Sequence, residues 1–153
     1  MLGNIDLDQL KEKENPIPLL KIYFSNNPNI KDTKDDITKL YQTHNWNKNI
    51  LLKILFGSLF GDDIQNNFLI KVKYLKQFIE SPKDYEIIID CINKSCKIKP
   101  ENIKIINDIL YGFWYVDILD DNSILNWYNS SSLDLEIKKT SEPFINWLKN
   151  LTN

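Results

Sequence analysis

The 153-residue chain contains no alanine and no arginine, so all 19 of its basic residues are lysine. The absence of arginine excludes an arginine finger and a bidentate arginine clamp on phosphate. Histidine occurs once, at His44, and glycine four times, and no glycine-rich segment has the lysine and strand context of a phosphate cradle. These absences disfavour nucleotide chemistry and any nucleophile that relies on a histidine base.

Cysteine is also scarce, and no long apolar run is present. Cys91 and Cys96 are too few for a disulfide framework or, with one histidine, for a zinc site, and they are expected to be buried thiols. No stretch approaches the roughly 18 apolar residues of a membrane helix, and residues 1–15 lack the pattern of a secretory signal. The net charge of −2 argues against bulk nucleic-acid binding. The sequence therefore predicts a cytoplasmic protein without a metal or other cofactor.

Apolar residues recur at helical spacing nearly throughout the chain. Residues 1–14 are expected to form a flexible N-terminal extension, followed by a helical domain over residues 15–153. Pro143 is expected to kink or restart the last helix. Short connections between consecutive helices predict an all-α domain of seven or eight helices that pack antiparallel, either as a bundle or as a stack of helix hairpins. The apolar faces run over residues 19–24, 37–44, 50–59, 68–79, 85–96, 103–113, 119–128 and 133–148.

Charge is distributed unevenly. Residues 71–104 contain eight lysines and five acids, whereas residues 105–137 contain no basic residue and six acids. The second window is also rich in aromatic residues, namely Tyr111, Phe113, Trp114, Tyr115, Trp127 and Tyr128. Carboxylates beside aromatic rings suit a lysine-rich partner, because both attract ammonium groups. The alternative is that the rings belong to the core and the acids are ordinary charges at helix starts.

Two segments near the end of the sequence carry a family resemblance. Residues 115–128 (YVDILDDNSILNWY) and 141–149 (SEPFINWLK) resemble the first and second aromatic–acidic boxes of the W-two domain. This domain ends eukaryotic translation initiation factor five and the epsilon subunit of initiation factor two B, and it occurs in factor-five-mimic proteins and some relatives of factor four G. Weaker similarity to the factor-five domain extends upstream, so that the resemblance covers roughly residues 15–150.

The resemblance implies an all-helical, HEAT-type domain with a scaffolding role. In the family, this domain helps to assemble the preinitiation complex by binding the lysine-rich N-terminal tail of the initiation factor two beta subunit. It also contacts initiation factors three, one and four G. The same partners are therefore expected for this chain, and no membrane or direct nucleic-acid contact is required.

The charge pattern and the resemblance together predict the site. The acids are assigned to lysine contact, and most aromatic and aliphatic box residues to packing of the last two helices. Lys71, Lys73 and Lys76 form a candidate basic face for other partners, the alternative being a solvated helix surface. The predicted partner-binding residues are Tyr115, Asp117, Asp120, Asp121, Trp127, Tyr128, Asp134, Glu136, Glu142 and Trp147.

Departures from the family pattern limit what the resemblance implies. The zinc-binding, GTPase-activating half of factor five has no counterpart here, so the chain is expected to be a non-enzymatic, C-terminal fragment of a longer protein. An aspartate pair, Asp120 and Asp121, stands where the family usually has glutamates, and the family's acidic tail is missing. Two alternatives to a factor-five adaptor stay open: the guanine-nucleotide-exchange domain of the factor two B epsilon subunit, and a factor-five-mimic regulator.

Overall fold

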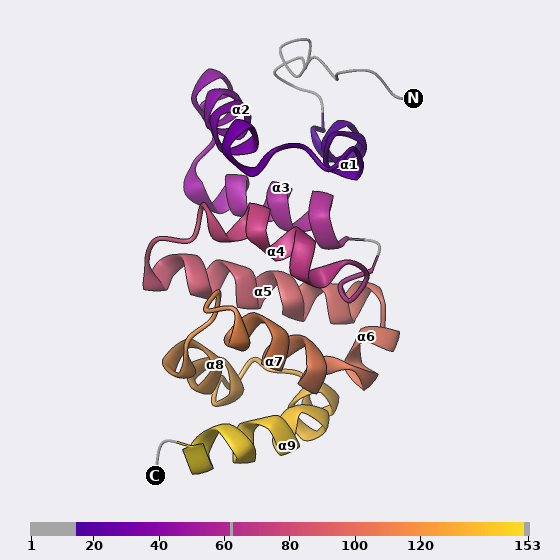
Figure 1. Cartoon of the computed structure of the whole chain (residues 1–153). Helices are drawn as coiled ribbons and strands as arrows, with labels where there is room; N and C mark the ends of the chain where they lie inside the picture. The colour runs from indigo at the N-terminus through magenta and orange to yellow at the C-terminus, as the bar shows by residue number, and fades with distance from the viewer. Residues whose placement is uncertain (1–14, 62, 152–153) are drawn as a thin grey trace. The chain divides into compact units, whose positions relative to one another are not determined.

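The computed structural model describes residues 15–61 and 63–151, and every regular element in these ranges is a helix (Figure 1). The predicted all-α class is thereby confirmed. The expected extension over residues 1–14 lies outside the described residues. The chain divides into two compact units, with the boundary between Glu80 and Ser81. The helices are α1 (Ile17–Ser25), α2 (Ile30–Thr43), α3 (Lys48–Phe60), α4 (Phe68–Lys76), α5 (Pro82–Ile98), α6 (Glu101–Lys104), α7 (Ile106–Tyr115), α8 (Asp121–Tyr128) and α9 (Leu135–Leu151).

The described ranges thus contain nine helices rather than the predicted seven or eight. The difference arises in the helix expected over residues 103–113, which is divided into α6 and α7. Ile105 separates them with φ −111° and ψ 15°, outside the values of a regular helix. Neither glycine nor proline marks this break, and the apolar periodicity continues across it. The sequence pattern therefore predicted one helix where the structure has two.

Asparagine and aspartate mark several helix boundaries in this glycine-poor chain. Asn29, Asn47 and Asp120 precede α2, α3 and α8, and their side-chain oxygens accept hydrogen bonds from first-turn N–H groups. Asn45 and Asp117 follow α2 and α7 with φ of 52° and 63°. Glycine usually adopts this left-handed conformation, but asparagine and aspartate, with their short polar side chains, adopt it more readily than other L-residues do.

In the first unit, α3 packs against α1 and α4, and α2 packs against α4. Leu52, Leu55 and Phe60 of α3 are almost completely buried in this core. The Tyr23 hydroxyl of α1 donates a hydrogen bond to the Asp36 carboxylate of α2 at 2.7 Å. Burial, together with the adjacent carboxylate, raises the pKa of Tyr23, so the hydroxyl stays protonated and joins the two helices.

In the second unit, α7 packs against α9, α8 packs against α5 and α9, and the short α6 contacts α5, α7 and α9. Ile88 on α5, Phe113 on α7 and Ile145 on α9 are fully buried in its core. Cys91 and Cys96 are buried thiols on α5, as predicted, and burial raises the pKa of Cys96 to about 11. None of the described helices is long and apolar enough to span a membrane.

Candidate functional site: an acidic–aromatic groove

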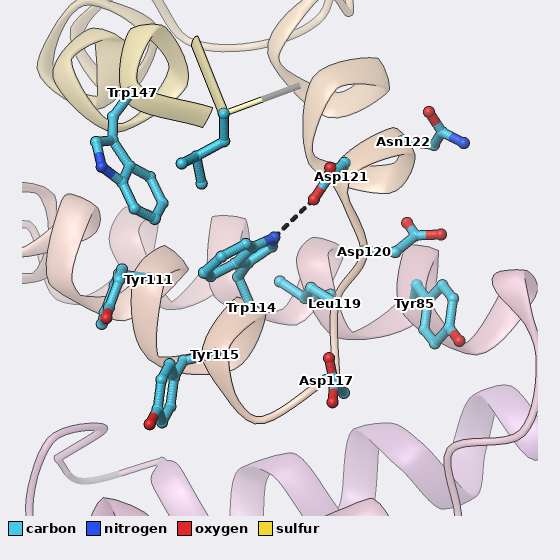
Figure 2. Close-up of a pocket in the computed structure, with 11 residues that line it drawn as sticks. Tyr85, Tyr111, Trp114, Tyr115, Asp117, Leu119, Asp120, Asp121, Asn122 and Trp147 are labelled. Carbon is cyan, nitrogen blue, oxygen red and sulfur yellow. Dashed lines mark hydrogen bonds between the residues drawn. The ribbon is translucent and has the colours of Figure 1, made fainter. Parts of the chain in front are cut away.

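A groove of about 820 Å³ opens on the second unit. It is built mainly by the end of α7, the connection to α8, the start of α8 and the last turns of α9 (Figure 2). One side chain comes from α5. The residues that line it are Tyr85, Tyr111, Trp114, Tyr115, Asp117, Leu119, Asp120, Asp121, Asn122, Trp147 and Leu151.

Four aromatic rings from α7 and α9 form one wall of this groove. Tyr111, Trp114 and Tyr115 lie on one face of α7 because they are spaced three and four residues apart. Tyr111 and Tyr115 are stacked, with ring centroids 5.8 Å apart. Trp147 of α9 meets Tyr111 and Trp114 edge to face, at centroid distances of 5.6 and 5.2 Å. These are favourable aromatic geometries, so the wall is held together by its own contacts.

Three of the four rings are exposed to solvent, and the fourth, Trp114, is half-buried. The exposed fractions are 44% for Tyr111, 66% for Tyr115 and 39% for Trp147. The sequence prediction assigned most box aromatics to packing, but the structure places Tyr115 and Trp147 on the groove surface. Because the face of an aromatic ring carries partial negative charge, exposed rings attract cations.

The way α7 ends determines the position of Asp117. The N–H groups of Asp117 and Ile118 bond to the carbonyl oxygens of Trp114 and Phe113, at 3.1 and 3.0 Å. This is a Schellman arrangement, with Asp117 at the left-handed position and Ile118 and Phe113 both fully buried. The buried pair anchors the turn, while the Asp117 side chain is exposed and lines the groove.

Asp120 and Asp121 serve the local structure as well as supplying charge. The Asp120 Oδ1 atom accepts a hydrogen bond from the Ser123 N–H at 2.8 Å and caps α8. The Asp121 Oδ1 atom accepts one from the Trp114 indole Nε1–H at 2.6 Å (Figure 2). A carboxylate can accept several hydrogen bonds, so each aspartate retains capacity for a cation.

The groove carries negative charge on one side and aromatic surface on the other. Figure 2 shows Tyr111, Tyr115 and Trp147 on one side of Trp114, with the three aspartates on the opposite side. No lysine or histidine is among the described residues that line it. Like charges gathered in a concave surface reinforce one another's potential, so the arrangement favours a positively charged ligand.

Two of the predicted aromatic residues lie outside this groove. Trp127 lines a separate pocket of about 280 Å³ between α5 and α8, and its buried Nε1 atom has no hydrogen-bond partner among the residues that the structure describes. Tyr128 is covered by lysines of α9, with the Lys138 and Lys149 Nζ atoms 5.1 and 5.8 Å from its ring centroid. The ring faces of Tyr128 are therefore engaged within the chain.

Three predicted acids, Asp134, Glu136 and Glu142, also do not line the groove. All three are exposed at the start or along α9, and the Asp134 Oδ1 atom accepts a hydrogen bond from the Glu136 N–H at 2.9 Å. The structure therefore brings together five of the predicted residues. These are Tyr115, Asp117, Asp120, Asp121 and Trp147.

The lysines of the candidate basic face lie on α4, in the first unit. Successive residues of an α-helix are rotated by about 100°, so Lys73 and Lys76 lie about 60° apart on the exposed side. Lys71 points to the opposite side, near the buried Leu75, and its Nζ atom donates to the Asp63 carbonyl oxygen at 3.5 Å. The structure thus places Lys73 and Lys76 on one face and separates Lys71 from them.

The prediction omitted several residues that line the groove. Tyr111 and Trp114 have a recognisable signal, since with Tyr115 they form an aromatic helical face inside the window that lacks lysine. Two others lie inside the first box, on either side of Asp120 and Asp121, and the remaining two have no comparable signal because their place depends on how distant helices pack. The first two are Leu119 and Asn122, and the last two are Tyr85 and Leu151.

Comparisons with known proteins identify the family of the chain. The W2 family, described as eIF4-gamma/eIF5/eIF2-epsilon, matches residues 73–152, which include every groove residue. Eukaryotic translation initiation factor 5 of Zea mays is 27% identical over 106 residues. That alignment covers 67% of this chain and 23% of the Zea mays protein, so the chain spans about a quarter of that relative's length. No solved structure matches the chain significantly.

The family match extends over more than half of the chain and contains both aromatic–acidic boxes. The similarity to initiation factor 5 points to one of the proteins named in the family description. The chain belongs to the W2 family of eIF4-gamma, eIF5 and eIF2-epsilon and carries the protein-interaction domain of these translation initiation factors.

Proposed function

We propose that the acidic–aromatic groove binds a lysine-rich segment of another initiation factor. The observation that carries the proposal is the convergence of three carboxylates and three exposed rings in one groove whose described lining contains no basic residue. Lysine is the complementary side chain. Its ammonium group pairs with a carboxylate, and its four-carbon stem packs along an aromatic face.

The protein's own lysines illustrate the aromatic half of this recognition. Lys138 and Lys149 both lie over the ring of Tyr128, within 6 Å of its centroid. Such a contact contributes about 0.5–1 kcal/mol at an exposed site. Tyr111, Tyr115 and Trp147 offer equivalent faces to lysines supplied by a partner, and the aspartates add charge pairing and steering.

Family membership supports a specific partner and role. The proposed ligand is the lysine-rich N-terminal tail of the initiation factor two beta subunit. In this role the chain is a non-catalytic, cytoplasmic adaptor in the preinitiation complex, with initiation factors three, one and four G as further partners. The similarity to eIF5 over 67% of the chain supports an adaptor rather than an exchange domain.

The proposal is tested by titrating the chain with a synthetic peptide that has the sequence of that tail, at two salt concentrations. We expect micromolar affinity that weakens as salt rises, because charge pairs at an exposed groove are screened. A scrambled peptide of equal charge controls for sequence order. Absence of binding, or equal affinity for the scrambled peptide, contradicts the proposal. A parallel assay of GDP release from initiation factor two tests the alternative of a nucleotide-exchange domain. Catalysis of GDP release by this chain would establish that alternative.

Replacing Asp117 with glycine is expected to change stability and affinity in opposite directions. Glycine adopts φ 63° without the strain of a Cβ atom, so the free energy of unfolding should rise by about 0.5–1 kcal/mol. Loss of one of three carboxylates should weaken peptide binding about 3- to 10-fold, since a charge pair contributes on the order of 1 kcal/mol. Urea denaturation measures the first effect and peptide titration the second.

Asn45→Gly is the matched control for this variant. Asn45 occupies the same left-handed position after α2, in the first unit. The free energy of unfolding of the Asn45→Gly variant should rise to a similar extent, while its affinity for the peptide stays unchanged. If Asp117→Gly binds the peptide as tightly as the wild type, Asp117 is not a contact.

A further inference from the structure

Helix α9 contains a proline in its interior and nevertheless continues from Leu135 to Leu151. Pro143 has no N–H to offer the carbonyl of Lys139, and its ring crowds that preceding turn. Such a position usually opens the backbone hydrogen-bond ladder of a helix. The helix that carries Trp147 into the groove therefore has a weak point one turn before that residue.

A side chain from α7 bridges this weak point. The Asn107 Nδ2 atom donates a hydrogen bond to the Thr140 carbonyl oxygen at 2.9 Å. Its Oδ1 atom accepts one from the Phe144 N–H at 3.1 Å. In a regular helix, these two backbone groups are partners of each other. The amide orientation is unambiguous, because a carbonyl oxygen can only accept and an N–H can only donate.

The bridge is continuous with the aromatic wall of the groove. On α7, Tyr111 lies one turn after Asn107, on the same face of the helix. On α9, Trp147 follows Phe144 by three residues, and their rings are 5.6 Å apart. Tyr111 then contacts Trp147. Asn107 contacts residues 140 and 144, and Tyr111, one turn later on α7, contacts Trp147, about one turn later on α9. The amide bridge and the aromatic rings are therefore neighbours along the interface between the two helices.

We infer that Asn107 is a positioning residue for the groove. It sets the register of α9 against α7 at Pro143 and thereby places Trp147 beside Tyr111 and Trp114. Asn107 does not line the groove and acts on the ligand only through Trp147. The effect on peptide affinity rests on the proposed function, whereas the effect on the position of Trp147 does not.

The test compares Asn107→Ala with wild-type protein by nuclear magnetic resonance of the tryptophan indole N–H groups. The signal of Trp147 is assigned by its loss in Trp147→Ala. We expect Asn107→Ala to shift this signal while that of Trp46, in the first unit, stays in place. Asn126→Ala is the matched control, because Asn126 is exposed on α8 and does not line the groove. A role in stability alone leaves the signals of the folded protein unmoved.

Peptide titration adds the functional readout. Asn107→Ala should weaken binding of the lysine-rich peptide about tenfold. When Trp147→Ala is already present, adding Asn107→Ala should weaken binding by less than about twofold further. The losses of binding free energy do not add when two residues act as one unit. If Asn107→Ala fails to fold, Asn107→Asp replaces it, since it keeps the size and the acceptor for the Phe144 N–H and replaces the donor by a carboxylate oxygen that repels the Thr140 carbonyl oxygen.

A Trp147 signal that stays in place in folded Asn107→Ala or Asn107→Asp overturns the inference, and so do affinity losses that add in the double variant. If the wild-type chain binds no lysine-rich peptide, the proposed function fails. The position of the Trp147 indole signal then tests the positioning role by itself: a shift in the Asn107 variant supports the role, and an unchanged signal overturns it.

Discussion

Replacing Trp147 with alanine is expected to lower the affinity for the lysine-rich peptide about 30-fold, which corresponds to about 2 kcal/mol. Trp147 contacts Tyr111, Trp114 and Phe144, so its removal deletes the ring that joins the two helices of the aromatic wall. Interface tryptophans at the centre of such clusters commonly dominate binding energy. Titration of the labelled peptide, followed by fluorescence anisotropy, measures the change.

Trp46→Ala is the matched control, because it removes the same side chain from the first unit, where Trp46 contacts His44. The affinity of the Trp46→Ala variant for the lysine-rich peptide should equal that of the wild type. The 39% exposure of Trp147 implies a loss of stability smaller than the 3–5 kcal/mol typical of a fully buried tryptophan. The binding assay can therefore be made on folded protein. Equal affinity losses in both variants would show that the groove is not the site of binding.

Replacing Phe113 with alanine is expected to lower the free energy of unfolding by about 3–5 kcal/mol. Phe113 is fully buried on α7, so the substitution loses burial of the ring and leaves a cavity. The same residue holds the turn that carries Asp117, since the Phe113 carbonyl oxygen accepts hydrogen bonds from the N–H groups of Ile118 and Leu119. Urea denaturation monitored by circular dichroism measures the loss.

Leu135→Ala serves as the control for this experiment. Leu135 is 82% exposed at the start of α9, and its truncation should change the free energy of unfolding by less than about 0.5 kcal/mol. A loss below about 1 kcal/mol for Phe113→Ala would contradict the assignment of Phe113 to the core of the second unit. It would also remove the proposed link between that core and the acidic turn.

Much of the fold was predictable because helix formation depends on short-range sequence patterns. Apolar spacing located the helical segments, and the predicted all-α class is confirmed. The exception, the break at Ile105, has no glycine or proline to signal it. The polar N-caps Asn29, Asn47 and Asp120 also follow from local chemistry, since a short side chain with an oxygen atom satisfies the first N–H groups of a helix.

The site was predictable in its chemistry and only partly in its members. The stretch without lysine, residues 105–137, indicated an acidic surface with aromatic residues. In the structure, Asp117, Asp120 and Asp121 line the candidate groove. The structure adds Tyr85 from α5 and directs Tyr128 toward lysines of its own chain. These two outcomes depend on the rotation of each helix against its neighbours, which local spacing does not specify.

Local sequence is enough to specify the helical class, the helix boundaries that carry caps, the sign of the charge and the two boxes that identify the family. Each of these depends on residues close together in the chain. Three contacts depend instead on how the helices pack: Trp147 lies against Tyr111, Asp121 accepts a hydrogen bond from the Trp114 indole, and Asn107 bridges α9 at Pro143. Contacts between helices depend on how whole faces pack, so residues with equal local propensity acquire different roles.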